Sequence, residues 1–226
     1  MPAKLFNIES LDGGGKTTQV KIVEKYLEEK KIKYKHLHFP MYGHNSFSET
    51  ISMFLRGEFG TRKEVDPYFV ANIFAMDRFC FLPELNKLIE ENDLIILDRY
   101  VFSNIAYQGA KVSGKERSRI KMWINDFEYN FLRLPYPDLT IFLDNDLSVI
   151  NQRLIERANN ETREYLNGKK DIHEADMEFQ SNVRDLYLSM YNVYNNYEII
   201  PCVINNVNLN PDEIFETYKE HLNKIL

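Results

Sequence analysis

Residues 5–18 read LFNIESLDGGGKTT, an apolar run followed by a glycine-rich turn and Lys16-Thr17-Thr18. The stretch nearly matches the phosphate-binding loop G-x-x-x-x-G-K-[ST], in which a backbone free of side chains wraps a polyphosphate. The following helix adds free N–H groups and the positive end of its dipole. The Lys16 amine can reach the β- and γ-phosphates, and the Thr17 hydroxyl can bind Mg²⁺. We therefore expect a nucleoside triphosphate site formed by Ser10, Leu11, Asp12, Gly13, Gly14, Gly15, Lys16, Thr17 and Thr18.

One position of this loop departs from the pattern. Ser10 stands where the first glycine of the motif would fall. If that position requires a positive φ, the serine strains the turn at a cost of about 1–3 kcal/mol. If the position has ordinary strand geometry, the serine is harmless and can add a hydroxyl near the phosphates. The sequence leaves both alternatives open.

The composition indicates a chain that can bury a full core within one domain. It has 226 residues and a formal net charge of −6 at pH 7, which argues against a nucleic-acid-binding surface. Cys80 and Cys202 lack metal-ligand spacing and are expected to be reduced thiols. No apolar run approaches membrane length, and residues 1–10 show no signal pattern. We expect a soluble, cytoplasmic protein without a nucleic-acid or membrane partner.

Apolar runs alternate with segments of helical periodicity along the chain. The apolar runs are 5–9, 34–39, 94–98, 139–144 and 198–204. They lack the alternation of half-exposed strands and are typical of strands that are covered on both faces. Helical periodicity is found at 16–31, 67–91, 115–133, 146–158, 174–197 and 211–226, with Pro67 and Pro211 suited to first turns. The alternation predicts a three-layer α/β/α domain with a parallel sheet and ligands at the carboxyl ends of its strands.

Residues 158–173, ANNETREYLNGKKDIH, differ in character from the rest of the chain. They are polar and charged, and they have no apolar face. Their composition is that of a solvated loop. Their place after a strand and a helix of a P-loop protein is equally consistent with a mobile lid. Both readings stay open.

Three further groups of residues suggest chemistry beyond the loop. Asp98 directly follows the apolar run 94–97, where an acid can hold Mg²⁺, and Arg99 beside it offers a planar fork for phosphate oxygens. Phe74 and Arg78 lie one helical turn apart, so a ring and a guanidinium face the same way. Asn104 and Gln108 share a helix face next to Tyr107, and their amides suit the edge of a pyrimidine. Phe39 is either part of this site or a packing residue.

In combination, these segments resemble the bacterial thymidylate kinases of the P-loop nucleoside monophosphate kinase family along almost the whole chain. The matching segments are FNIESLDGGGKTTQ, HFPMYG, LRGEFG, NIFAMDR, DRYVFSNIAYQGA, LTIFLDND with Arg153, and DIHEADMEFQSNVRDLYL. The pattern DRY-x-x-S-N-x-A-Y-Q-G-A after a P-loop with an acid at Asp12 is specific. The resemblance implies one kinase domain over 1–226, with a five-stranded parallel sheet and a lid.

The same resemblance implies an activity and its partners. Mg²⁺-ATP would donate a phosphoryl group to dTMP, giving dTDP and ADP in dTTP synthesis, and the enzyme would be a homodimer. The apolar helix 67–82 exposes more aromatic surface than one core should need, which fits a dimer.

The resemblance also assigns roles to individual residues. Asp12 would contact the sugar hydroxyl of the acceptor, and Asp98 would lie near the magnesium. Phe74 would stack on thymine, and Arg153 would lie along adenine. The acceptor phosphate would be held by Arg78 and Arg99, and the base and ribose would be read by Ser103, Asn104, Tyr107 and Gln108, with Phe39 nearby.

Some family members place a catalytic arginine within the P-loop, at a position that Gly13 occupies here. The charge must then come from elsewhere, and Arg153, Arg157 and Arg163 flank or occupy the candidate lid. We predict that Arg157 or Arg163 contacts the transferred phosphoryl group. Together with Lys16 and Arg99, these two arginines are the predicted catalytic cations.

Three other functions of a P-loop protein are alternatives to this one. Another small P-loop kinase, for nucleosides or other nucleotides, is disfavoured by residues 72–78 and 98–110, which suit a pyrimidine monophosphate. A signalling switch specific for guanine would require N-K-x-D, and neither Asn86-Lys87 nor Asn223-Lys224 is followed by the acid. A P-loop protein that binds without catalysis stays open because of Ser10. Turnover of ATP against a panel of acceptors separates the three.

Overall fold

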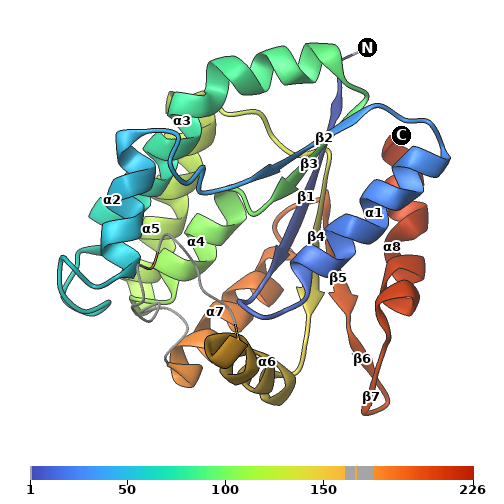
Figure 1. Cartoon of the computed structure of the whole chain (residues 1–226). Helices are drawn as coiled ribbons and strands as arrows, with labels where there is room; N and C mark the ends of the chain where they lie inside the picture. The colour runs from blue at the N-terminus through green and yellow to red at the C-terminus, as the bar shows by residue number, and fades with distance from the viewer. Residues whose placement is uncertain (1, 161–165, 167–175) are drawn as a thin grey trace.

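The computed structural model describes residues 2–160, 166 and 176–226, and residues 157–160 by their backbone only. Five parallel strands form one sheet in the order β2-β3-β1-β4-β5 (Figure 1). Their bounds are β1 (Lys4–Ser10), β2 (Tyr34–His38), β3 (Leu94–Asp98), β4 (Leu139–Asp144) and β5 (Tyr197–Pro201). The predicted five-stranded parallel sheet is therefore confirmed.

Helices cover both faces of the sheet and make three layers (Figure 1). One face carries α1 (Lys16–Glu29) and α8 (Pro211–Ile225), whose apolar residues form one core cluster with the strands. The opposite face carries α3 (Pro67–Glu91), α4 (Val101–Gly109), α5 (Gly114–Asn125) and α7 (Met177–Met190), which share a second cluster. All five residues of β3 are buried, as expected for a strand covered on both sides.

The remaining described elements lie at the edges of these layers. Helix α2 (Ser46–Leu55) packs on α3, and α6 (Leu147–Asn160) follows β4. Strands β6 (Val203–Ile204) and β7 (Val207–Asn208) form a small antiparallel hairpin before α8. Most of the candidate lid at 158–173, with the whole of Arg163, lies outside the described residues, as does the Arg157 side chain.

Most predicted elements are confirmed, and three boundaries are wrong. The run 198–204 divides into β5, which ends at Pro201, and the hairpin strand β6, because a proline cannot donate to the ladder. The predicted helix 115–133 is α5 followed by a π-helix, η1 (Asp126–Phe131), as shown by Leu132 N–H donating to Phe127 O. The predicted helix 174–197 shortens to α7, and Asp176 caps its start.

Helix α2 was not predicted because its sequence, SFSETISMFL, is poor in strong helix formers. It begins with a capping box, in which the Asn45 side chain accepts hydrogen bonds from Phe47 N and Ser48 N. Its apolar face packs against α3 through a third cluster that includes Ile51, Phe54 and Val70. Capping and tertiary contacts, rather than helix propensity, explain this helix.

The sheet topology brings the chemistry-bearing residues to one edge. The central strand β1 pairs with β3 on one side and β4 on the other, with Ile8 opposite Asp98 and Ser10 opposite Leu143. The connections that leave β1 and its neighbours run in opposite directions, which opens a crevice at the carboxyl ends of the strands. The P-loop emerges from β1 directly into that crevice.

A buried glutamine joins the first and last helices behind the P-loop. The Gln19 Nε2 group donates to Pro211 O at 2.8 Å, and its Oε1 accepts from the Tyr218 hydroxyl at 2.8 Å. Gln19 and Tyr218 are both almost fully buried. A partner lost at this point leaves a buried polar atom unsatisfied.

We predict that Tyr218→Phe lowers the free energy of unfolding by about 1–3 kcal/mol, because it leaves Gln19 Oε1 buried and unsatisfied. Urea denaturation measures the change. Tyr197→Phe is the matched control, since the buried Tyr197 hydroxyl has no hydrogen-bond partner in the described part of the chain. Equal effects of the two substitutions would contradict the role assigned to the Gln19 bond.

Candidate active site

The first part of the site is the P-loop, and Ser10 is the residue that decides its geometry. Ser10 is the last residue of β1, lies opposite Leu143 in β4 and has no positive φ. The strained alternative is therefore wrong. The Ser10 hydroxyl donates to Leu11 O at 2.7 Å and accepts from Lys16 Nζ at 3.3 Å. The serine thus adds a polar contact to the loop lysine.

Two glycines of the loop are required by their surroundings. A Cβ at Gly14 would lie 2.6 Å from Ser10 Oγ and 2.9 Å from Leu11 O, so no larger residue fits beside the serine. Gly13 has a φ of 75°, a conformation that side chains other than glycine rarely adopt. An arginine at that position would be strained, which agrees with its absence from this loop.

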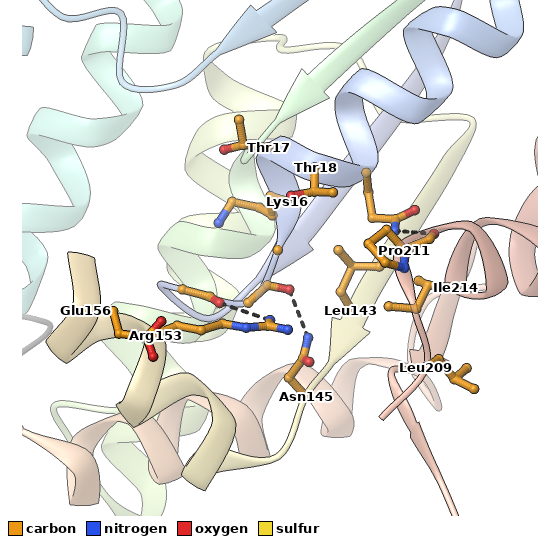
Figure 2. Close-up of a pocket in the computed structure, with 14 residues that line it drawn as sticks. Lys16, Thr17, Thr18, Leu143, Asn145, Arg153, Glu156, Leu209, Pro211 and Ile214 are labelled. Carbon is orange, nitrogen blue, oxygen red and sulfur yellow. Dashed lines mark hydrogen bonds between the residues drawn. The ribbon is translucent and has the colours of Figure 1, made fainter. Parts of the chain in front are cut away.

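A pocket of about 490 Å³ opens on one side of the P-loop (Figure 2). The amide of Asn145, just after β4, donates to Gly14 O at 2.8 Å, and Arg153 of α6 donates to Gly13 O at 3.4 Å. These bonds occupy loop carbonyls and support the loop from the side of β4 and α6. Sequence reasoning missed Asn145, although its place directly after the strand LTIFLD was a usable signal.

The far wall of this pocket is apolar. Leu143, Leu209, Pro211 and Ile214 lie across from Arg153 (Figure 2). Apolar walls with a few fixed polar groups are typical of a small-molecule site. The pocket therefore has the glycine-rich loop on one side and, on the other, an apolar wall against which a ring can pack.

Lys16 and Asp98 form the charged centre of the crevice. Burial, and then the nearby charge of Arg99, lower the pKa of Lys16 from 10.5 to about 8. Burial alone would raise the pKa of Asp98, but a hydrogen bond from His38 and the charge of Lys16 hold it well below its usual value. Asp98 is therefore ionised at neutral pH.

On the other side of the loop, Arg99 ties the end of β3 to the P-loop. Its backbone has a φ of 69°, an uncommon conformation for an arginine. Its guanidinium donates to Asp12 Oδ1 at 2.5 Å, to Ser10 O at 3.2 Å and to Ser103 Oγ at 3.1 Å. The Tyr107 hydroxyl donates to Asp12 Oδ2 at 2.8 Å. The P-loop, the end of β3 and helix α4 are thus connected through the Arg99–Asp12 ion pair.

Beneath this cluster lies Glu9, an acid that sequence reasoning missed. It is fully buried and accepts hydrogen bonds from Tyr100 N at 2.9 Å, Ser103 Oγ at 2.6 Å and Tyr187 Oη at 2.9 Å. The acid within the buried apolar run 5–9 was the available signal. Glu9 connects β1, α4 and α7 below Arg99.

Comparisons with known proteins identify this arrangement. Residues 8–214 match the family model described as thymidylate kinase. The chain belongs to the thymidylate kinase family. Among the relatives it is similar to, a probable thymidylate kinase 1 of Saccharolobus solfataricus is 34% identical over 197 residues, covering 87% of each chain. A thymidylate kinase of Clostridium novyi is 30% identical over 222 residues, covering 95% of this chain and 96% of its own.

The fold agrees with this family. A solved thymidylate kinase from Candida albicans superposes with a TM-score of 0.72 at 24% identity, covering 99% of this chain and 93% of its own. Membership of the family makes this chain an ATP-dependent kinase that phosphorylates dTMP to dTDP. Within residues 2–160 and 176–226, no helix is both long and apolar enough to cross a membrane.

The remaining residues that were predicted to contact substrate lie along α3 and α4, except Phe39, which follows β2. Phe74 is partly buried against the α2–α3 cluster, and Gln108 is buried on α4. Phe39 is buried and packs edge-on against Phe81, so it contributes to the core at the base of the crevice. Their contacts with substrate stay predictions.

Arg78 has a partner that the sequence did not reveal. It is almost fully buried, and its Nε and Nη2 donate to the two oxygens of Glu128 at 2.6 and 2.7 Å. Asn104 also donates to Glu128, at 2.8 Å. The predicted contact between Arg78 and the acceptor phosphate stays a prediction, but two of its three guanidinium nitrogens are engaged within the protein.

We predict that the affinity of the free enzyme for ATP falls as pH rises above about 8, because Lys16 then loses its charge. The binding constant should decline by about tenfold per pH unit until the pKa of the ATP-bound amine is reached. Calorimetric titration between pH 7 and 10 measures it. Lys16→Arg, which stays charged, should flatten the profile, and a flat profile for the unsubstituted enzyme would refute the assignment.

Proposed function

We propose that the two sides of the P-loop bind the two substrates of the thymidylate kinase reaction. ATP occupies the pocket of Figure 2, with its phosphates on the loop amides and its adenine along Arg153 and the apolar wall. dTMP occupies the side of Asp12 and Arg99. The observation that carries the proposal is the Asp12–Arg99 ion pair. An acid on a phosphate-binding loop can face a second substrate and accept a hydrogen bond from its sugar hydroxyl.

Arg99 gives this arrangement a mechanism. Its guanidinium donates to Asp12, and in the proposed mechanism the acceptor phosphate takes the place of that carboxylate as its partner. Asp12 then becomes available to the sugar hydroxyl. The acceptor phosphate is itself the nucleophile, so the enzyme mainly aligns it with the γ-phosphate and neutralises charge through Lys16 and Arg99.

The residues present fit a magnesium ion. The Oδ1 atom of Asp98 is buried and has no hydrogen-bond partner among the described residues, and the ionised carboxylate is the kind of ligand that Mg²⁺ prefers. Thr17 is exposed at the start of α1 beside the same crevice. We propose that Thr17 and Asp98 hold the ion, directly or through water, and that the ion neutralises phosphate charge when bound.

We propose further that Phe74 stacks on thymine, that Asn104 and Gln108 read the base, and that Ser103 and Tyr107 border the ribose. Gln108 Oε1 and Asn104 Oδ1 are buried without a partner in the described part of the chain, which leaves both available to a ligand. The Tyr107 ring leaves little space for a 2′-hydroxyl next to Asp12.

The proposed assembly is a homodimer of single-domain chains in the cytoplasm. Phe69 and Phe79 are exposed on α3, Met122 is exposed on α5 and Phe131 at the end of η1, and a second copy can cover such exposed apolar side chains. Cys80 and Cys202 are free thiols, as in proteins of reducing compartments. A sedimentation mass of one chain, independent of concentration, would contradict the dimer.

The expected acceptor profile tests the proposed function. In a coupled ADP-release assay dTMP should be the best acceptor, and dUMP should have a kcat/KM about 10–200-fold lower because it lacks one methyl group. Thymidine should not be phosphorylated, since it lacks the phosphate that Arg99 would hold. Phosphorylation of thymidine would indicate a nucleoside kinase, and no turnover with any acceptor would indicate a binding protein.

A second prediction concerns the cation that the P-loop lacks. We propose that Arg157 or Arg163 contacts the transferred phosphoryl group, so that alanine at one of them lowers kcat by about 10³–10⁵-fold. Arg119→Ala, an exposed arginine on α5, is the matched control and should leave kcat unchanged. Near-normal turnover by the Arg157→Ala/Arg163→Ala double variant would overturn the proposal.

A further inference from the structure

A buried carboxylate in the π-helix connects two residues of the acceptor side. Glu128 lies in η1, a type of helix that is rare and frequently marks functional sites, and its side chain is completely buried. Resting on the function proposed above, we propose that Glu128 is a positioning residue that fixes the Asn104 amide. The fixed amide then selects pyrimidines that carry an N3–H, such as thymine and uracil, and rejects cytosine.

The first step is the pairing that holds the Glu128 carboxylate in place. Burial would lower the pKa of Arg78, but the charge and hydrogen bonds of Glu128 raise it above its ordinary value. The two side chains form a bidentate pair at 2.6 and 2.7 Å, the geometry in which arginine holds a carboxylate most firmly. Both Glu128 oxygens therefore accept from Arg78, which holds the carboxylate in a fixed position.

The second step is the orientation of Asn104. Its Nδ2 group donates to Glu128 Oε1 at 2.8 Å and to Ala71 O at 2.9 Å. An amide nitrogen has two hydrogens, so both are used. Both Glu128 oxygens already accept from Arg78, and hence the Asn104 amide cannot flip without placing its own oxygen against an oxygen of Glu128. The remaining atom, Oδ1, is buried and has no partner among the described residues.

The third step is the position of this oxygen relative to the base. Ala71, which accepts from Asn104, precedes Phe74 by one turn of α3, and Arg78, which binds Glu128, follows it by one turn. The two anchors of the Glu128–Asn104 network therefore bracket the ring that is proposed to stack on the base. Asn104 is thereby tied to the turn of α3 that precedes that ring, and its Oδ1 is a fixed acceptor.

The chemical consequence is a test of the pyrimidine N3 atom. Thymine and uracil carry a hydrogen there and can donate to Asn104 Oδ1, whereas neutral cytosine presents a lone pair at N3. Two acceptors would then face each other in a buried site. Sites built to hydrogen-bond a substrate group reject analogues that lack it by about 10⁴–10⁵-fold.

The experiment compares kcat/KM for dTMP and dCMP, because this ratio does not depend on the folded fraction of a variant. In Glu128→Gln the new amide can donate toward Asn104, which frees the Asn104 amide to turn. The dTMP/dCMP ratio should fall by about 10–100-fold, with KM for dTMP raised and kcat little changed. Glu128→Asp keeps the carboxylate but moves it away from Asn104, because the side chain is one methylene shorter. It should lower the dTMP/dCMP ratio by a smaller factor, and it replaces Glu128→Gln as the test if that variant does not fold.

Tyr129→Phe is the matched control. Tyr129 neighbours Glu128 in η1 and is buried, and its hydroxyl has no hydrogen-bond partner in the described part of the chain. The ratio of kcat/KM for dTMP to that for dCMP in Tyr129→Phe should equal the ratio in the unsubstituted enzyme. An unchanged ratio in both Glu128 variants would overturn this inference alone, whereas absence of dTMP turnover in the unsubstituted enzyme would overturn the proposed function.

Discussion

The ion pair between Asp12 and Arg99 is the interaction on which the rest of the site depends. A positive φ at Arg99 turns its side chain from the end of β3 toward the P-loop, and such a conformation is tolerated only where the surroundings hold it. Here the surroundings are Glu9, Ser103 and Tyr187, which form a buried hydrogen-bonded layer beneath the pair. Because Tyr187 belongs to α7, the layer also joins the acceptor side to the helix that follows the candidate lid.

The P-loop is shared between two chemically different halves. On one side its carbonyls are held by Asn145 and Arg153, and the apolar wall of the pocket lies across from them. On the other side the loop presents a carboxylate to a guanidinium. Ser10 fits between these halves because it has strand geometry and because Gly14 leaves room for its hydroxyl. The departure from the glycine motif therefore changes a contact of Lys16 and leaves the loop unstrained.

Local patterns in the sequence predicted the architecture and the loop, whereas contacts distant in sequence were out of reach. The strand runs and the helix at 67–91 follow from periodicity, and the P-loop follows from glycine spacing. Helix α2 depends on its capping box and on packing against α3, so propensity missed it. The ion pair between Glu128 and Arg78 joins residues 50 positions apart, and no pattern near Glu128 in the sequence indicates that it pairs with a buried arginine. Likewise, the sequence could suggest that Arg78 binds an anionic group, but not that this group is the carboxylate of Glu128 within the protein.

The central claim is that one loop serves two nucleotides at the same time. The most direct measurement is calorimetric titration with a single compound in which adenosine and thymidine are joined through their 5′-oxygens by a chain of five phosphates. The account predicts one compound per chain and an affinity about 10²–10⁴-fold higher than that of ATP or dTMP alone, since the second half binds intramolecularly. Two compounds bound per chain, or an affinity no higher than that of ATP, would contradict it.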